Sequence, residues 1–167
     1  MVHPDDIKRV GELSVIASVQ PDHMWAPIFS EHPFHKILGE ERCKYVYPFK
    51  SLAANGAILA FGSDHPIAEI DPMRGIYRAV TRLSEDKQPT GGWCPDEKLT
   101  VGEALKAYTI GSAYQMWNEK ITGTLERGKF ADIAVLDRNL FNINPEEILD
   151  TKSVMTMLGG KIIYKSI

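Results

Sequence analysis

A short apolar run, Ile58–Phe61, constrains the fold of this chain more than any other stretch. The turn signal Asn55-Gly56 precedes it, and Pro66 behind it prevents further strand pairing. Because its apolar residues are continuous rather than alternating, the run predicts a parallel β-strand covered on both faces. The strand ends at Gly62 and places the Asp64 carboxylate at its C-terminal tip, where α/β barrels keep their catalytic groups. Spacing alone leaves equally open that Asp64 only caps a loop or the next helix.

Length and composition indicate an ordinary globular protein. The chain has 167 residues, enough for one domain with a sizeable core, of which 44% are apolar and 25% charged. A net charge of -3 gives no reason to expect nucleic acid or an anionic membrane as partner. No apolar run approaches the ~20 residues of a membrane span, and no signal-peptide pattern opens the chain, so we expect a cytoplasmic protein. Cys43 and Cys94 lack CxxC spacing, which favours reduced, structural cysteines.

Six segments carry helix signals. Asp71-Pro72 pairs an N-cap residue with proline at the first helical position, and Thr100 with Glu103 forms a capping box before the longest predicted helix. Apolar residues after both starts recur at helical spacing, so each helix should lay one face on the core. In the longest helix, Gly111 predicts a close crossing with another helix. The predicted helices are Pro4–Leu13, Phe34–Leu38, Phe49–Ala54, Asp71–Leu83, Val101–Trp117 and Asn144–Leu149.

Strand signals accompany these helices and become dense past Asn118. The run Ser14–Val19 is a second candidate for a buried strand, and a helix followed by such a strand is the rhythm of α/β folds. The pair Gly159-Gly160 is a strong cue for a two-residue hairpin turn near the end of the chain. The other segments predicted to be extended are Tyr45–Tyr47, a hairpin-like Thr122–Lys129, Phe130–Asp137, and the hairpin arms Val154–Leu158 and Lys161–Lys165.

Two polar segments, Gln20–His23 and Gly62–Asp64, directly follow the predicted buried strands. If these strands are parallel neighbours, both segments lie on the same rim of the sheet. A histidine and a carboxylate are suitable ligands for a divalent metal that activates water. However, a catalytic zinc needs about three protein ligands. A histidine after Pro-Asp also suits a surface loop, so spacing alone leaves both interpretations open for His23.

Three other histidines have open roles. His32 and His35 lie three residues apart in a proline-broken loop, where they could bind metal, belong to a substrate loop or face solvent. His65, beside Asp64, could line a pocket or simply fill space.

Four longer motifs stand out in the sequence: Phe61-Gly62-Ser63-Asp64-x-Pro66, Asp71-Pro72-x-x-Gly75-Ile76, Glu103-Ala104-Leu105-x-Ala107-Tyr108-Thr109 and Gly123-x-Leu125-x-x-Gly128-Lys129-x-Ala131-Asp132-x-x-Val135-Leu136-Asp137. They closely resemble motifs of the metal-dependent amidohydrolase superfamily, and the last resembles its carboxyl-terminal signature. Val19-Gln20-Pro21-x-His23 further resembles the family-3 branch, which includes N-substituted formamide deformylase-like enzymes. The resemblance extends from Val2 to Tyr164.

The resemblance implies the carboxyl-terminal part of a (β/α)8 TIM barrel plus a small β-sandwich domain. Residues 1–120 would form the last barrel strands and helices, and residues 121–167 the β-sandwich segment. The implied reaction is hydrolysis of a non-peptide C–N bond in an amide- or formamide-like small molecule, with a divalent metal, zinc. Asp64 would be metal ligand and catalytic base, taking a proton from the attacking water and passing it to the leaving nitrogen. His23 would be a second metal ligand.

The sequence also departs from the family pattern. It contains no His-x-His pair, and 167 residues are too few for a barrel of ~250. His3 precedes a helix and does not match a ligand position. We therefore interpret the chain as the carboxyl-terminal portion of a longer enzyme, and expect it alone to be inactive and without catalytic metal. The alternative is a non-catalytic, self-associating module. If the strand Ser14–Val19 belongs to a barrel whose preceding strands are missing, it presents an open edge, and we therefore expect a homo-oligomer.

Overall fold

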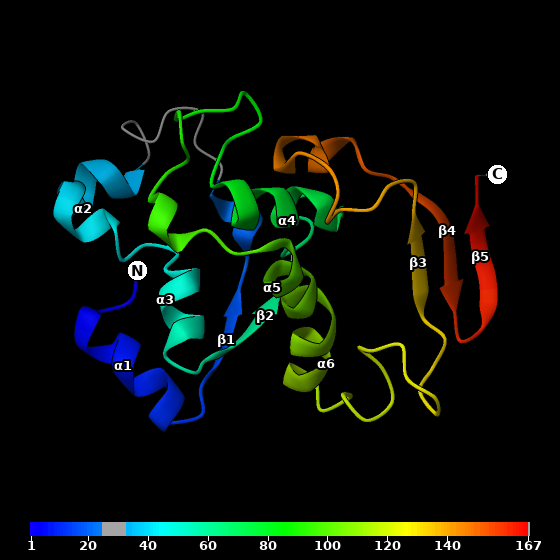
Figure 1. Cartoon of the computed structure of the whole chain (residues 1–167). Helices are drawn as coiled ribbons and strands as arrows, with labels where there is room; N and C mark the ends of the chain where they lie inside the picture. Colours follow the sequence, from blue (N-terminus) through cyan, green and yellow to red (C-terminus); the bar gives the residue numbers. More distant parts are fainter. Residues whose placement is uncertain (25–32, 167) are drawn as a thin grey trace.

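The computed structural model describes residues 1–24 and 33–166, in which helices accompany two separate small sheets (Figure 1). Strands β1 (Ile16–Val19) and β2 (Ile58–Phe61) pair in parallel, residue for residue. Strands β3 (Ile133–Leu136), β4 (Ser153–Leu158) and β5 (Lys161–Lys165) form an antiparallel sheet in that order. The predicted mixed α/β structure is therefore confirmed. The division into barrel and sandwich segments at residues 120 and 121 stays a prediction.

The helices begin largely where their capping signals lie. Asp71 caps α4 by accepting a hydrogen bond from the amide of Met73, and Thr100 and Glu103 form the predicted capping box of α5. The observed α-helices are α1 (Pro4–Glu12), α2 (Pro33–Cys43), α3 (Phe49–Ala54), α4 (Pro72–Thr81), α5 (Val101–Lys106) and α6 (Ser112–Gln115). A π-helical turn, η4 (Ala107–Gly111), joins α5 to α6, and the 3-10 helices are η1 (Pro21–His23), η3 (Pro95–Glu97) and η5 (Pro145–Asp150).

Several predicted elements differ in the structure. Tyr45–Tyr47 is not a strand: the Val46 amide bonds the Cys43 carbonyl in a turn, and Tyr47 has a left-handed φ of 51°. Thr122–Lys129 forms turns instead of a hairpin, closed by a bond from the Phe130 amide to the Ile121 carbonyl. The predicted helix Phe34–Leu38 is part of the longer α2, and Asn144–Leu149 is the 3-10 helix η5.

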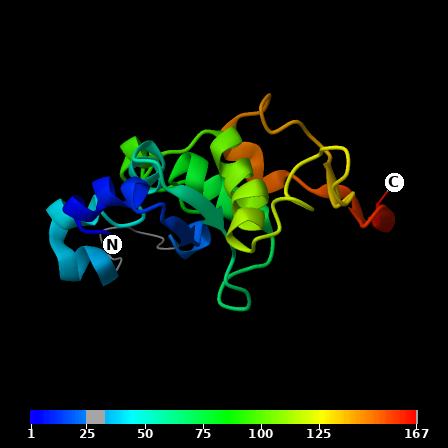
Figure 2. The same ribbon diagram turned by 90° about the horizontal axis from the view of Figure 1, so that it is seen from below.

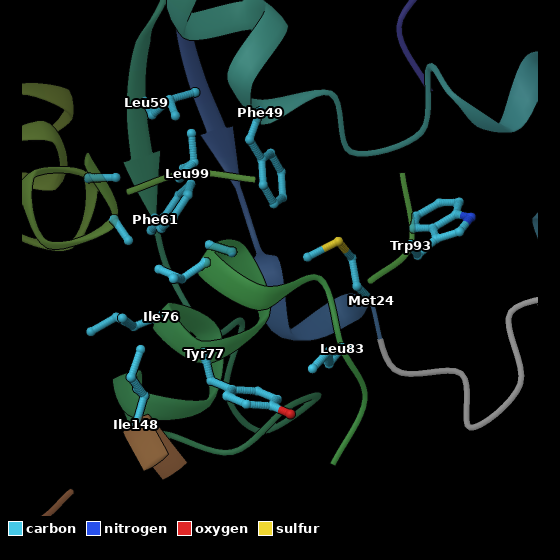
Figure 3. Packing of buried hydrophobic residues seen from close by; sticks show 14 of the residues in the cluster. Met24, Phe49, Leu59, Phe61, Ile76, Tyr77, Leu83, Trp93, Leu99 and Ile148 are labelled. Carbon is cyan, nitrogen blue, oxygen red and sulfur yellow. The ribbon is translucent and has the colours of Figure 1, made fainter. Parts of the chain in front are cut away.

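The core lies around β2, α3 and α4. The apolar residues that recur at helical spacing after Asp71-Pro72 are all buried: Met73, Ile76, Tyr77, Val80 and, just past the end of α4, Leu83. Aromatic rings link the elements, since the Phe49 and Phe61 ring centroids lie 5.4 Å apart and Phe61 and Tyr108 form a second contact of the same length. Figure 3 shows Phe49, Leu59 and Phe61 close together above Ile76 and Tyr77 of α4. This packing holds α4 beside the C-terminal ends of β1 and β2, and the arrows of both strands point toward α4 in Figure 1.

Gly111 marks a close approach, but of a helix to a strand. A Cβ atom built on Gly111 would lie 2.0 Å from the carbonyl oxygen of Leu59 in β2. The predicted crossing of two helices is therefore wrong in its partner. The missing side chain lets η4 rest directly against the backbone of β2.

The antiparallel sheet lies at one end of an elongated molecule, opposite α1 and α2 (Figure 2). Every residue of β5 is exposed, including Ile162, Ile163 and Tyr164. This sheet therefore leaves apolar side chains in solvent. Among the described residues, no helix combines the length and apolar character needed to cross a membrane.

Candidate metal centre

The parallel pairing of β1 and β2 brings the two predicted polar tips together. His23 ends η1, directly after β1, and Asp64 follows β2 by three residues. The Nε2 atom of His23 lies 3.6 Å from Oδ2 of Asp64, with the two side chains 25% and 55% exposed. The prediction that both tips share one rim of a parallel sheet is confirmed.

The backbone after β2 turns sharply to present the carboxylate. The amide of Gly62 still bonds the carbonyl of Val19, at 3.3 Å, which extends the β1–β2 pairing by one step. Asp64 then adopts a left-handed φ of 60°, which aspartate tolerates better than most residues, and its carbonyl accepts the amide of Ile67 at 2.8 Å. The segment between β2 and α4 projects from the body of the molecule (Figure 2), so this turn carries Asp64 into an accessible position.

The histidine–carboxylate pair fits a cation held between its two members. The Nε2 atom of His23 is buried and has no hydrogen-bond partner among residues 1–24 and 33–166. A distance of 3.6 Å to Asp64 is too long for a direct hydrogen bond. Two ligands that each lie 2.0–2.2 Å from one tetrahedral ion are roughly 3.4 Å apart. A ligated cation would therefore satisfy the orphaned nitrogen without a large movement of either side chain.

The rest of the described chain adds no further ligand to this pair. Across residues 1–24 and 33–166, no three His, Cys, Asp or Glu side chains gather as a metal-binding group. Nδ1 of exposed His65 lies 3.3 Å from the Ala68 carbonyl, and His35 is half-buried in α2. His32 lies outside the described residues. His3 accepts the amide of Asp5 at the start of α1.

Sequence reasoning missed a buried ionic network beside His23. The carboxylate of Asp22 is 4% exposed and binds two arginines of α4, with Oδ1 2.6 Å from Nε of Arg78 and Oδ2 3.1 Å from Nε of Arg74. Arg74 also reaches Glu85 at 2.6 Å. The available signal was the position of Arg78, which lies between Tyr77 and Ala79 in a stretch of α4 that is otherwise apolar. An arginine there needs a buried partner, and Asp22 is that partner.

Two hollows flank the tips of the strands. The first, of about 270 Å³, is polar and is lined by Asp22, His65 and Arg74, among others. The second, of about 860 Å³, is largely apolar and runs from Ser63 between α4, α5–α6 and the segment leading into β3. In its wall, burial raises the pKa of Tyr108, assisted by the charges of Asp22 and Asp71, so that its hydroxyl stays neutral. Space for a small molecule therefore exists beside the pair.

A histidine and an aspartate that face each other at the ends of parallel strands define a candidate hydrolase site of the metal-dependent kind. The chain belongs to the amidohydrolase family, whose model matches residues 1–164. The resemblance predicted from the sequence is confirmed by this match.

Individual relatives agree with the family assignment. The chain is 35% identical over 162 residues to Protein LONG AFTER FAR-RED 3 of Arabidopsis thaliana; the match covers 96% of this chain and 27% of that protein. It is 30% identical over 120 residues to the N-substituted formamide deformylase of Arthrobacter pascens, covering 72% and 22%. Among solved structures, a metal-dependent hydrolase from Pyrococcus horikoshii OT3 superposes with a TM-score of 0.74 at 34% identity, covering 87% and 29%. The chain thus spans roughly a quarter of the length of these relatives.

Proposed function

We propose that this chain forms the carboxyl-terminal part of a metal-dependent amidohydrolase that cleaves a non-peptide C–N bond in an amide- or formamide-like small molecule. The observation that carries the proposal is the buried Nε2 of His23, which has no hydrogen-bond partner among the described residues and lies 3.6 Å from the carboxylate of Asp64. In this proposal β1 and β2 are the last strands of a (β/α)8 barrel, and the antiparallel sheet belongs to a β-sandwich. The family membership and the parallel pairing of β1 and β2 support this arrangement.

His23 and Asp64 would hold a divalent cation, zinc in this proposal, which supplies Lewis-acid activation of water when bound. His23 contributes a neutral imidazole nitrogen. Among the described residues, no donor makes a hydrogen bond to the carboxylate of Asp64, so a carboxylate oxygen stays available as a base. That oxygen accepts the proton of the attacking water and returns it to the leaving nitrogen. The polar hollow beside the pair would accommodate the amide group, because its lining offers both donors and acceptors.

The alternative is a non-catalytic module that associates with itself. The exposed apolar residues of β5 favour it, because a sheet with an uncovered apolar face tends to bind another surface. The two proposals differ in what they require of Asp64.

The test compares Asp64→Asn with Asp96→Asn in the longer polypeptide that also carries the remaining ligands. Asparagine keeps the shape of the side chain but cannot accept a proton, so turnover of N-formyl and N-acyl compounds should fall by about 10²–10⁴ in Asp64→Asn. Asp96 is exposed and far in sequence from the pair, so its variant should keep full activity. Circular dichroism controls for folding. A metal-loaded Asp64→Asn enzyme with near-normal kcat would contradict the assignment.

A further inference from the structure

The side chain of Arg78 in α4 binds the residues on both sides of His23. Arg78 donates from Nε to the Asp22 carboxylate at 2.6 Å, and from Nη1 to the carbonyl oxygen of Met24 at 2.5 Å. His23 is the residue between these two. The Arg78 and Asp22 side chains are each only 4% exposed, so water does not compete for these bonds.

Two further contacts fix the same three residues. Arg74 donates to the second carboxylate oxygen of Asp22, so neither oxygen is free to turn away. The hydroxyl of Tyr47 donates to the carbonyl of His23 at 3.2 Å. Three consecutive residues, 22 to 24, are thereby tied to other elements of the fold. The turn η1 is three residues long and Gln20 provides no side-chain cap, so these contacts add to the burial of Pro21 and Met24 in fixing its position.

Stability alone does not account for the network. Buried ion pairs lose about as much free energy through desolvation as they gain through attraction, and apolar replacements are often equally stable. An apolar side chain cannot donate hydrogen bonds to a carboxylate and a peptide carbonyl and so cannot fix the position of one relative to the other. A planar guanidinium with several fixed donors does this, and the point charge of a lysine does not. The choice of arginine therefore suits orientation of the turn.

We infer that Arg78 is a positioning residue, which holds the turn η1 so that Nε2 of His23 faces Asp64 before any cation binds. The inference rests on the proposed function, because the role of His23 as a ligand is part of that proposal. Helix α4 begins at Pro72, shortly after the turn that carries Asp64. Helix α4 thus follows the turn that carries Asp64 and also binds the turn that carries His23.

The test uses the isotopically labelled 167-residue chain with two matched variants, Arg78→Lys and Arg74→Lys. Both replace an arginine that binds Asp22, but only Arg78 also binds the carbonyl of Met24. Two quantities are measured by NMR: the χ1 coupling constants of His23 without metal, and the shifts of its ring nitrogens during titration with zinc chloride. In Arg78→Lys we expect an averaged χ1 and zinc binding weaker by about 10–100-fold, as for other residues that orient a ligand. Arg74→Lys should stay close to the unchanged chain in both.

The outcomes separate this inference from the proposed function. A folded Arg78→Lys chain whose His23 keeps a single rotamer and its zinc affinity would overturn the positioning role. If the rotamer is lost in Arg78→Lys while the metal-loaded Asp64→Asn variant of the longer polypeptide keeps near-normal kcat, the positioning role stands and the proposed function falls. Should Arg78→Lys not fold, Asp22→Asn serves as the second variant. It removes the carboxylate charge that binds Arg78 and keeps the shape of the side chain at position 22. The same loss of the single rotamer is expected there, and a retained rotamer would count equally against the inference.

Discussion

Replacing Gly111 by alanine should destabilise the fold, although Gly111 lies in a helical segment. Gly111 ends η4, where the helix meets β2 without a side chain between them. The new methyl group would lie 2.0 Å from the carbonyl oxygen of Leu59 and 3.2 Å from that of Lys106. Because the nearer atom belongs to the backbone of a strand, it cannot rotate away as a flexible side chain would. Helix and strand must separate by about 1.4 Å to bring the 2.0 Å approach to an ordinary contact of 3.4 Å.

Two opposing effects determine the size of the change. Alanine is favoured over glycine inside a helix by about 1 kcal/mol. Overpacking a close interface typically costs ~1–3 kcal/mol, and a clash with backbone belongs at the upper end of that range. The net loss in the free energy of unfolding should therefore be about 2 kcal/mol. For a chain of this length such a loss lowers Tm by roughly 4–8 °C.

The assay is urea denaturation followed by circular dichroism, with Gly102→Ala as the matched control. Gly102 lies in α5, and a methyl group there would meet only Cε1 of Phe141, at 3.7 Å. This variant should be as stable as the unchanged chain or slightly more stable, because only the gain in helix propensity applies. A Gly111→Ala chain at least as stable as the Gly102→Ala chain would refute the reasoning.

Three further predictions concern metal, pH and association. The 167-residue chain should hold no stoichiometric, tightly bound zinc because His23 and Asp64 are too few ligands; elemental analysis checks this, and one retained zinc per chain would contradict it. Burial works to raise the pKa of Glu103, but bonds from Lys50 and Thr100 lower it below the ordinary 4.5. The contribution of Glu103 to the free energy of unfolding is thus present above about pH 4.5 and is lost as pH falls further. Because the pair with Lys50 is exposed, this contribution is about a few tenths of a kcal/mol. In urea titrations, Glu103→Gln should therefore lose less stability in acid than the unchanged chain. Finally, the chain should form dimers or larger oligomers through the open edge of β1, so a monodisperse monomer in light scattering across micromolar concentrations would count against this.

Local patterns determined much of the fold. The cap at Asp71 and the capping box of Thr100 and Glu103 act within three residues of one chain segment, so the sequence alone predicts them. The apolar run Ile58–Phe61 likewise defines a strand and its end without reference to other segments. The terminal hairpin follows from a glycine pair between two strand-forming runs.

Tertiary contacts overrode local preference elsewhere. Tyr45–Tyr47 has the aromatic and β-branched residues of a strand, but none of the described strands pairs with it. The backbone carbonyl of Tyr47 instead accepts Nη1 of Arg82, at 2.9 Å, and its hydroxyl reaches the carbonyl of His23. Arg82 is fully buried, which lowers its pKa to about 10, and its guanidinium lies against the rings of Phe49 and Trp93. Partners this distant in sequence leave no periodic signal.

The candidate site shows the same division. The sequence by itself determined that a histidine and an aspartate follow two buried strands, because strand ends are read from short runs and turn residues. Only the tertiary structure decided that these strands are adjacent and that Arg78 binds the turn around His23. It also decided that Nε2 of His23 has no hydrogen-bond partner in the part of the chain that the structure describes. The physical reason is range: sequence patterns act over one or two turns of chain, whereas the bond from Arg78 to Asp22 joins residues 56 positions apart.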